Sequence, residues 1–210
     1  MLAYGPVSND GAIYADDVLV VAKKPAGLLS VPGRTEPDCL FARVQLEYAN
    51  ALVVHRLDQA TSGLMVFARG KANERHMSKQ FQARTVRKRY EALVAGHVRE
   101  ARGVIALPLA ADWPNRPLQK VDLENGKPSC TLWQVIGYDA ATDSTRLALT
   151  PETGRTHQLR VHLQAMGHSI VGDRLYAGRE APRLMLHACA LDIAHPTTGE
   201  PMHWESAAPF

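Results

Sequence analysis

Two short apolar runs on either side of one polar connection constrain the fold of this chain most. The runs are residues 51–54 and 64–68. Each has the length of a strand and neither has the spacing of an amphipathic helix, so we expect two buried strands. The connection contains one carboxylate, Asp58, and ends in a typical turn at residues 61–63. Reactive groups are often placed on connections held by rigid strands, although an aspartate in a loop can also simply cap a local amide.

Length and composition predict a globular protein with a full-sized core. The 210 residues are 46% hydrophobic and carry a formal net charge of only +3, which suits one domain, or one domain of two lobes. We expect residues 1–16 to be a loose segment and residues 17–210 to form the domain. No apolar run approaches ~18 residues and no signal peptide is visible, so we expect a cytoplasmic location. The three cysteines are far apart, and their odd number predicts buried thiols rather than a disulfide framework.

The remaining pattern is rich in strands. We expect strands at residues 18–22, 90–94, 103–108 and 145–149. The pair Asn125-Gly126 predicts a hairpin that joins residues 120–123 to residues 130–133.

Two segments have helical spacing. In residues 70–83 an apolar stripe contains Ala72, Met77 and Phe81, together with His76. A second helix opens within residues 153–163, and Gly167 is expected to end it.

Positive charge is concentrated next to the Asp58 connection. Residues 69–89 contain eight Lys or Arg and one acidic residue, a local excess of +7 in a chain whose total is +3. Such a stretch is either a solvated helix face or a surface that contacts phosphate groups. The second interpretation gains weight because the stretch leads directly into the strand at residues 90–94.

Several other chemistries fit poorly. His157 and His162 are five residues apart, not the four that place both rings on one helical face, so zinc is not expected. The Gly-x-Ser-x-Gly pattern of a serine hydrolase is absent around Ser62. A glycoside hydrolase needs two placed carboxylates, and only Asp58 lies in a motif.

Four segments together resemble one enzyme family. The string from His55 to Leu64 (His-Arg-Leu-Asp, then Thr-Ser-Gly-Leu) resembles the catalytic signature of the RluA family of RNA pseudouridine synthases. The family's other features are matched by Lys-Pro-x-Gly-Leu at residues 24–28, Lys-Arg-Tyr at residues 88–90 and Gly-Arg-Thr-His-Gln-Leu-Arg at residues 154–160. The resemblance covers nearly the whole chain. Residues 29–34 and 112–117 bring the resemblance closest to family members that act on both a 23S rRNA hairpin loop and a tRNA anticodon stem-loop.

This resemblance implies roles for individual residues. Asp58 would be the catalytic carboxylate, Tyr90 would lie against the target base, and Arg160 would pair with Asp58 and favour its charged form. Arg56 would fill the space that a flipped-out uridine vacates. Together with the basic stretch, the resemblance predicts RNA contacts by Arg56, Arg69, Lys79, Arg84, Arg87, Lys88 and Arg155.

The family reaction fixes the remaining expectations. Uridine and pseudouridine contain the same atoms, so no cofactor and no metal are required. The implied fold is α+β, a pseudouridine synthase fold with a mixed, mostly antiparallel sheet, flanking helices and a central cleft. No S4-type RNA-binding domain is expected, and the protein should act as a monomer on RNA. The alternative is a non-catalytic RNA-binding module of the same fold.

Overall fold

The structure is a computed structural model that describes residues 12–210. The described chain divides into two compact units, residues 12–87 with 188–207 and residues 88–187 with 208–210. Their strands pair mainly antiparallel and three α-helices accompany them, which confirms the predicted α+β class. Within residues 12–210, no helix combines the length and the apolar character that crossing a membrane requires.

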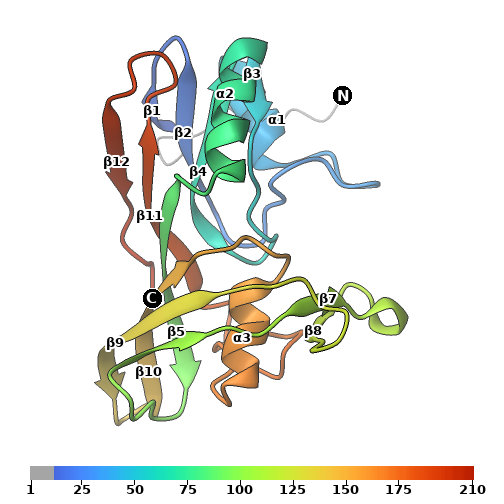
Figure 1. The fold of residues 1–210 in the computed structure, drawn as a ribbon, viewed down its shortest axis with the longest axis vertical. Coiled ribbons are helices and arrows are strands. Elements are labelled where there is room, and N and C mark those ends of the chain that lie inside the picture. Colours follow the sequence, from blue (N-terminus) through green and yellow to red (C-terminus); the bar gives the residue numbers. More distant parts are fainter. Residues whose placement is uncertain (1–11) are drawn as a thin grey trace. The chain divides into compact units, whose positions relative to one another are not determined.

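The first unit is built around β4 (Ser62–Arg69), which lies between β2 (Leu19–Lys24) and β11 (Leu186–Ala194) (Figure 1). The short β3 (Ala51–Val53) also pairs with β4, and β12 (Pro201–Glu205) pairs with β11. The strands expected at residues 18–22, 51–54 and 64–68 are thus confirmed.

Part of the predicted loose segment is ordered. β1 (Ala12–Ala15) pairs antiparallel with β2, so residues 12–15 belong to the sheet. The prediction was wrong there because a four-residue edge strand carries too little periodicity to be distinguished from a polar loop. Residues 1–11 of that segment lie outside the described residues.

Both faces of β4 are covered by helices. Val66 and Ala68 point to one face and pack in a core with Met77 of α2 (Lys71–Gln82). Phe67 points to the opposite face, where its ring stacks on Phe41 of α1 (Leu40–Glu47) with the centroids 6.3 Å apart. This double coverage explains why β4 reads as an unbroken apolar run rather than an alternating one.

α2 occupies the segment predicted to be helical, but its buried face differs in part. Met77 is buried and Phe81 packs on the core as expected, whereas Ala72 and His76 are exposed. Gln80 takes their place. Its side-chain amide donates to the Ala194 carbonyl (2.7 Å) and accepts from the Ala194 N–H (3.1 Å), a buried polar role that hydrophobic periodicity does not reveal.

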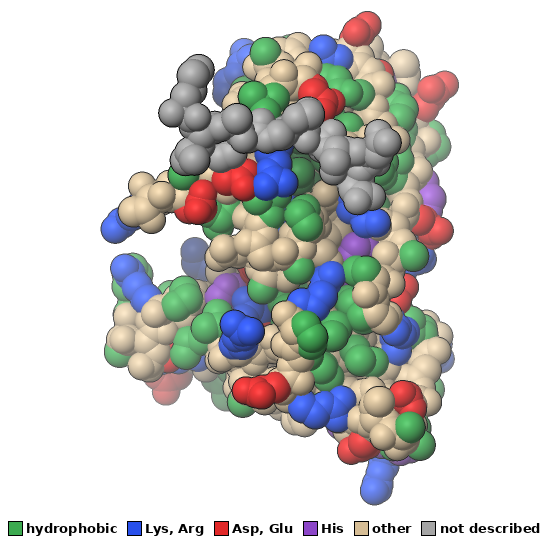
Figure 2. Space-filling view, turned by 180° about the vertical axis from the view of Figure 1, so that it is seen from behind, with side chains coloured by type: hydrophobic (Ala, Val, Ile, Leu, Met, Phe, Trp, Pro, Cys, Tyr) green, Lys and Arg blue, Asp and Glu red, His purple; other side chains and the backbone are tan. Residues whose placement is uncertain are grey.

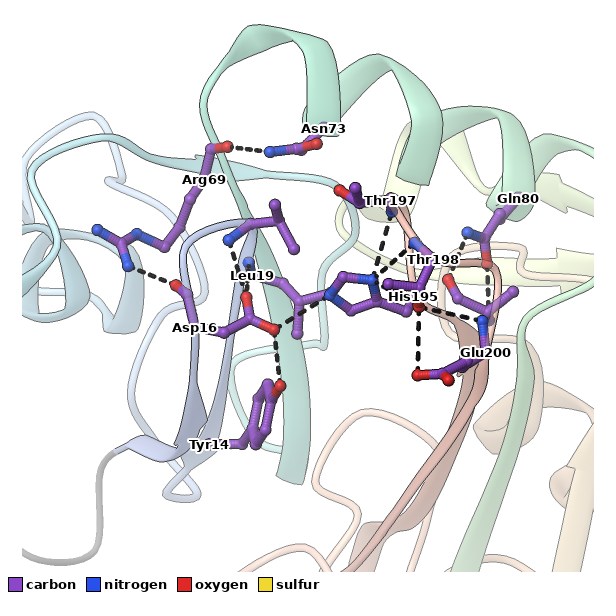
Figure 3. Close-up of polar contacts among 12 residues, drawn as sticks. Tyr14, Asp16, Leu19, Arg69, Asn73, Gln80, His195, Thr197, Thr198 and Glu200 are labelled. Carbon is purple, nitrogen blue, oxygen red and sulfur yellow. Dashed lines mark hydrogen bonds and ion pairs between the residues drawn. The ribbon is translucent and has the colours of Figure 1, made fainter.

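A polar network ties the turns of the first unit together (Figure 3). The Asp16 carboxylate accepts hydrogen bonds from the Tyr14 hydroxyl (2.6 Å), the Leu19 N–H (2.8 Å) and His195 Nε2 (3.2 Å). The Thr198 N–H in turn donates to His195 Nδ1 (3.1 Å). His195 therefore connects the β11–β12 turn to the β1–β2 turn.

The second unit contains the strand order β5-β10-β9-β6 and a separate two-stranded ribbon, β7–β8. A single 3₁₀ turn, η1 (Trp113–Asn115), lies between β7 and β8, and α3 (Gln158–Ala165) packs on β8 (Figure 1). The other bounds are β5 Arg87–Ala95, β6 Arg102–Ile105, β7 Leu109–Ala111, β8 Gln119–Val121, β9 Thr131–Asp139 and β10 Ser144–Pro151.

The predicted hairpin at Asn125-Gly126 is wrong. β8 pairs with β7, and β9 pairs with β6 and β10. Neither Asn125 nor Gly126 has the positive φ that a type I′ hairpin turn needs. Instead the Asp122 carboxylate accepts from the backbone N–H groups of residues 124 and 125, so a local side-chain turn replaces the hairpin.

α3 begins later than expected, at Gln158. Residues 153–157 lead into it as a loop, and its N-cap, His157, has φ +54°. The predicted end is confirmed, because Gly167 has φ +86° directly after the C-cap Met166.

Candidate active site

Asp58 lies partly buried on the connection between β3 and β4 in the first unit. Both of its neighbours are fastened to residues 24–30. Ser30 Oγ donates to the Leu57 carbonyl (2.7 Å) and accepts from the Leu57 N–H (3.1 Å). On the other side, Gln59 and Gly27 exchange two hydrogen bonds of 2.9 and 3.0 Å. The backbone that carries the Asp58 side chain is therefore fixed on both sides.

A buried lysine strengthens this anchor. Lys24 is 0% exposed, and its ammonium donates to the carbonyls of Pro25 (3.0 Å), Leu28 (2.6 Å) and Gln59 (2.9 Å). Burying an ammonium is costly unless acceptors satisfy it, and these carbonyls provide them. From the sequence, residues 24–28 had no role beyond family resemblance. In the structure, Lys24 and Gly27 form hydrogen bonds with Gln59 and so fix the Asp58 connection in place.

The turn after Asp58 depends on a glycine. Gly63 has φ +121°, and a Cβ there would lie 2.3 Å from the Ala188 carbonyl oxygen of β11. Only glycine tolerates both this backbone conformation and this close approach. Gly63 thereby allows β4 to start directly beside β11.

In the second unit, α3 presents Arg160, which is 4% exposed. Its Nε and Nη2 donate to the two carboxylate oxygens of Asp173 at 2.8 and 2.7 Å. This bidentate pair engages one edge of the guanidinium and leaves the Nη1 edge to other acceptors. The pairing of Arg160 with Asp58 that family resemblance implies stays a prediction.

The loop that carries Asp173 is itself tightly built. Gly172 has φ +79°, and a Cβ there would meet the Arg183 carbonyl oxygen at 1.8 Å. Asp173 Oδ1 also accepts from the N–H groups of Leu175 (3.0 Å) and Tyr176 (3.2 Å). The Arg160 guanidinium lies 5.0 Å from the Tyr176 ring centroid. Arg160 is thus held by a carboxylate and by an aromatic ring from the same loop.

Tyr90 and Lys88 come from β5 of the same unit. Tyr90 is buried and lies opposite Leu149 of β10. The ammonium of Lys88 has no hydrogen bond or ion pair with any residue of the described range 12–210, and burial lowers its pKa. An ideal Cβ on Gly154 would lie 3.7 Å from Lys88 Nζ, so the ammonium lies close to the 154–160 motif.

The other residues predicted to contact RNA differ in solvent exposure and in their partners within the protein. Arg56, Lys79, Arg84 and Arg87 are exposed in the first unit, and Arg155 is partly exposed in the second. Arg69 already has partners within the protein. Its guanidinium donates to Asn50 Oδ1 (3.0 Å) and to the Asp16 carbonyl, and its RNA contact stays a prediction. On the face that Figure 2 presents, Lys and Arg side chains are dispersed among polar and hydrophobic ones.

His162 has a structural explanation. It is 0% exposed, and its ring nitrogens lie 2.9 Å from Thr131 Oγ1 and 3.0 Å from the Leu107 carbonyl. Burial lowers its pKa, which favours the neutral ring. Among residues 12–210 there is no group of three His, Cys, Asp or Glu side chains arranged to hold a metal.

A cavity of about 280 Å³ in the first unit lies away from the motif residues. It is lined by Tyr14, His195, Thr198 and neighbouring residues of the β11–β12 turn. Its histidine is fully engaged by the Asp16 network described above, so we assign the cavity no role.

Sequence reasoning missed Lys24, Ser30, Asp173 and Tyr176. Lys24 and Ser30 form hydrogen bonds with backbone groups. Such contacts cannot be recognised from the pattern of side chains in the sequence. Asp173 is 13 residues from its partner Arg160, beyond any helical spacing. Residues 24–28 and 172–176, which contain Lys24 and Asp173, both resemble family sequence, and this resemblance is the signal that could have drawn attention to them.

Comparisons with known proteins match this arrangement of motifs. Residues 18–165 match the family described as RNA pseudouridylate synthase. The dual-specificity RNA pseudouridine synthase RluA of Escherichia coli (strain K12) is 51% identical over 204 residues, covering 94% of this chain and 93% of that protein. The protein of the same description from Vibrio parahaemolyticus is 50% identical over 215 residues, covering 97% of this chain and 84% of that protein.

Solved structures give the same result. Human RNA Pseudouridylate Synthase Domain Containing 1 matches with a TM-score of 0.83 and 32% identity, covering 100% of this chain and 87% of that one. Human RNA Pseudouridylate Synthase Domain Containing 4 matches with a TM-score of 0.76 and 25% identity, covering 96% of this chain and 89% of that one.

Proposed function

Because the chain belongs to the RNA pseudouridylate synthase family, we propose that it converts uridine to pseudouridine in RNA. The bacterial relatives are described as dual-specificity enzymes. We therefore propose two substrates, a hairpin loop of 23S rRNA and the anticodon stem-loop of tRNA. The protein would act as a monomer in the cytoplasm, with residues 17–210, extended by β1, forming its catalytic domain.

The proposed catalytic residues are Asp58, Tyr90 and Arg160. The observation that supports this most directly is the double anchor of the Asp58 connection, through Leu57 and through Gln59. A carboxylate that must meet one sugar carbon works best on a backbone that does not move during the reaction. A turn whose aspartate only caps a local amide would not need a buried lysine beneath it.

The reaction needs one carboxylate and a closed environment. The C–N glycosidic bond of uridine breaks, the base rotates, and the same sugar carbon joins ring C5. C5 then loses its proton and N1 gains one, so that the product is an isomer of the substrate. Asp58 either attacks the sugar or removes a proton from it. A uridine inside a stacked loop must first be flipped out, at a cost of a few kcal/mol. Tyr90 would stack on the flipped base, and Arg56 would fill the vacated space.

Lys88 supports RNA as the ligand. A half-buried ammonium without an acceptor is unfavourable in the protein alone, whereas an RNA phosphate would neutralise it. Arg155 of the adjacent motif and the exposed Lys79, Arg84 and Arg87 supply further cations for the backbone.

The test is turnover on isolated RNA. The purified protein is incubated with each synthetic stem-loop, and pseudouridine is counted per molecule. We expect conversion of one uridine in each, because a compact enzyme that reads a loop does not need the rest of the molecule. A protein that binds both stem-loops but converts neither would be the non-catalytic RNA-binding module. Conversion of only one would leave the family reaction standing and contradict dual specificity.

A further inference from the structure

The tip of the β7–β8 ribbon exposes an aromatic side chain without a structural need for it. Trp113 is 68% exposed at the start of η1. Figure 1 shows η1 at the end of the ribbon farthest from α3. An exposed indole presents a large flat face that can stack on another planar group.

The turn at this tip is closed by other groups. The Asp112 N–H donates to the Leu118 carbonyl (2.9 Å) and the Leu118 N–H donates to the Asn115 carbonyl (3.0 Å). Asn115 Nδ2 also donates to the Asp112 carboxylate at 2.9 Å. These bonds define the turn, and none of them involves the Trp113 side chain.

One face of the indole is already occupied by a cation. The Arg116 guanidinium carbon lies 3.4 Å from the centroid of the Trp113 ring, a stacked cation–π geometry. Within residues 12–210 this guanidinium makes no hydrogen bond, so its donors are available to an acceptor from outside. The stack orients the indole, and the exposed opposite face can receive a flat ligand.

The base of the ribbon is fixed to the loop that holds Arg160. Leu118 and Val121 pack against Tyr176 and Val161, and the Gln119 N–H donates to the Tyr176 hydroxyl (2.9 Å). Tyr176 also lies under the Arg160 guanidinium. A ligand held at the tip would therefore be positioned relative to Arg160 within one compact unit.

We propose that Trp113 and Arg116 form a stacking platform that binds one unpaired base of the RNA substrate on the free indole face, with Arg116 donating to the adjacent phosphate. This inference rests on the proposed function. It adds a binding element to the proposed catalytic residues. Aromatic faces accept any base, and arginine both stacks and pairs with phosphate, whereas an apolar protein partner would leave the Arg116 donors unsatisfied. The exposed Lys120 on β8 adds a second cation on the same ribbon.

The experiment compares RNA binding and turnover of Trp113→Ala, Trp113→Phe and the control Leu123→Ala. Leu123 is 77% exposed in the loop after β8 and is the matched exposed apolar side chain. For Trp113→Ala we expect stem-loop affinity to fall by about 5-fold to 150-fold, the range for losing one base stack. The KM should rise with kcat nearly unchanged, and the thermal unfolding midpoint should stay at the wild-type value. Trp113→Phe should recover part of the affinity, and Leu123→Ala should match the wild type.

Two further measurements identify the ligand as an unpaired base. A blunt duplex with the stem sequence should bind wild type and Trp113→Ala equally. Tryptophan fluorescence of the wild type should be quenched by the stem-loop, with the quenching absent in Trp113→Phe. Unchanged stem-loop affinity and KM in Trp113→Ala would overturn the platform, and so would an equal loss on the duplex. If wild type itself forms no pseudouridine, the proposed function fails instead, so the two failures are distinguishable.

Discussion

Arg160 and Asp173 form an ion pair that is almost completely removed from water, with side-chain exposures of 5% and 0%. Such a pair contributes little net stability compared with an apolar pair of the same shape, because both charges lose their hydration. The pair instead orients Arg160, because two parallel hydrogen bonds fix the plane of its guanidinium. In the proposed reaction, Asp173 would therefore act through the arginine that it positions.

Removing one member of this pair should destabilise the protein far more than removing both. Arg160→Met leaves the buried Asp173 carboxylate uncompensated, at a cost of about 3–5 kcal/mol. The double variant Arg160→Met/Asp173→Leu should regain most of that loss. Urea unfolding of Arg160→Met, of Asp173→Leu and of the double variant measures the coupling free energy between the two side chains. Additive losses would show that the two side chains do not compensate each other.

If Lys88 binds an RNA phosphate as proposed, it should give the RNA affinity a pH dependence. Burial lowers the pKa of its ammonium in the free protein, and a bound phosphate would raise it again. Affinity should therefore be constant while the free ammonium is protonated and fall as the pH rises through the lowered pKa. Measured between about pH 7 and 10, this fall should be present in wild type and absent in Lys88→Arg, which stays charged. Identical pH profiles would mean that the ammonium does not contact phosphate.

At the scale of elements, the Asp58 connection depends on how closely β4 approaches β11. Gly63 permits this approach, because a side chain there would collide with the Ala188 backbone at 2.3 Å. Two effects then add: a positive φ costs about 1–2 kcal/mol for other residues, and overpacking costs about 1–3 kcal/mol.

We therefore expect Gly63→Ala to lower the free energy of unfolding by several kcal/mol, on the order of those two costs combined. Gly137→Ala is the matched control, since its nearest neighbour would be Arg146 Cβ at 4.0 Å and its φ is not positive. Its stability should remain near wild type or rise slightly. Equal denaturation midpoints for the two variants would contradict the close approach.

Elements with strong local signals were predictable, and those set by distant partners were not. The apolar runs at residues 51–54 and 64–68 were recognisable by their length and composition, and the basic helix at residues 70–83 by its helical periodicity. The prediction of a hairpin at Asn125-Gly126 was wrong because β8 pairs with the preceding strand, β7, and not with β9. The Asp122 side chain also forms a different turn there. β1 was missed because its order comes from pairing with β2. The motifs located Asp58, Tyr90 and Arg160 in the sequence, but the supports of the site, Lys24 and Asp173, emerge only when the chain is folded.

At the scale of the whole molecule, charge is unevenly distributed along the chain. The net charge is +3, yet residues 69–89 alone carry an excess of +7. Bulk charge therefore predicts weak non-specific attraction to RNA, whereas the local stretch predicts a defined set of phosphate contacts.

Salt dependence measures those contacts. Replacing the exposed Lys79, Arg84 and Arg87 by glutamine should flatten the slope of log affinity against log salt by roughly 0.7–0.9 per lost contact. The control variant replaces Arg99, Arg102 and Lys127, which are equally exposed in the second unit, and should keep the wild-type slope. If both variants keep the wild-type slope, the stretch is only a solvated face.

We expect Asp58 to be the essential catalytic carboxylate. Asp58→Asn keeps the size of the side chain and removes its charge. Pseudouridine formation should be abolished, while stem-loop affinity stays within about tenfold, or ~1.4 kcal/mol, of wild type. Asp17→Asn, which neutralises an exposed carboxylate of the same unit, should form pseudouridine normally. Turnover by Asp58→Asn near the wild-type rate would contradict the account.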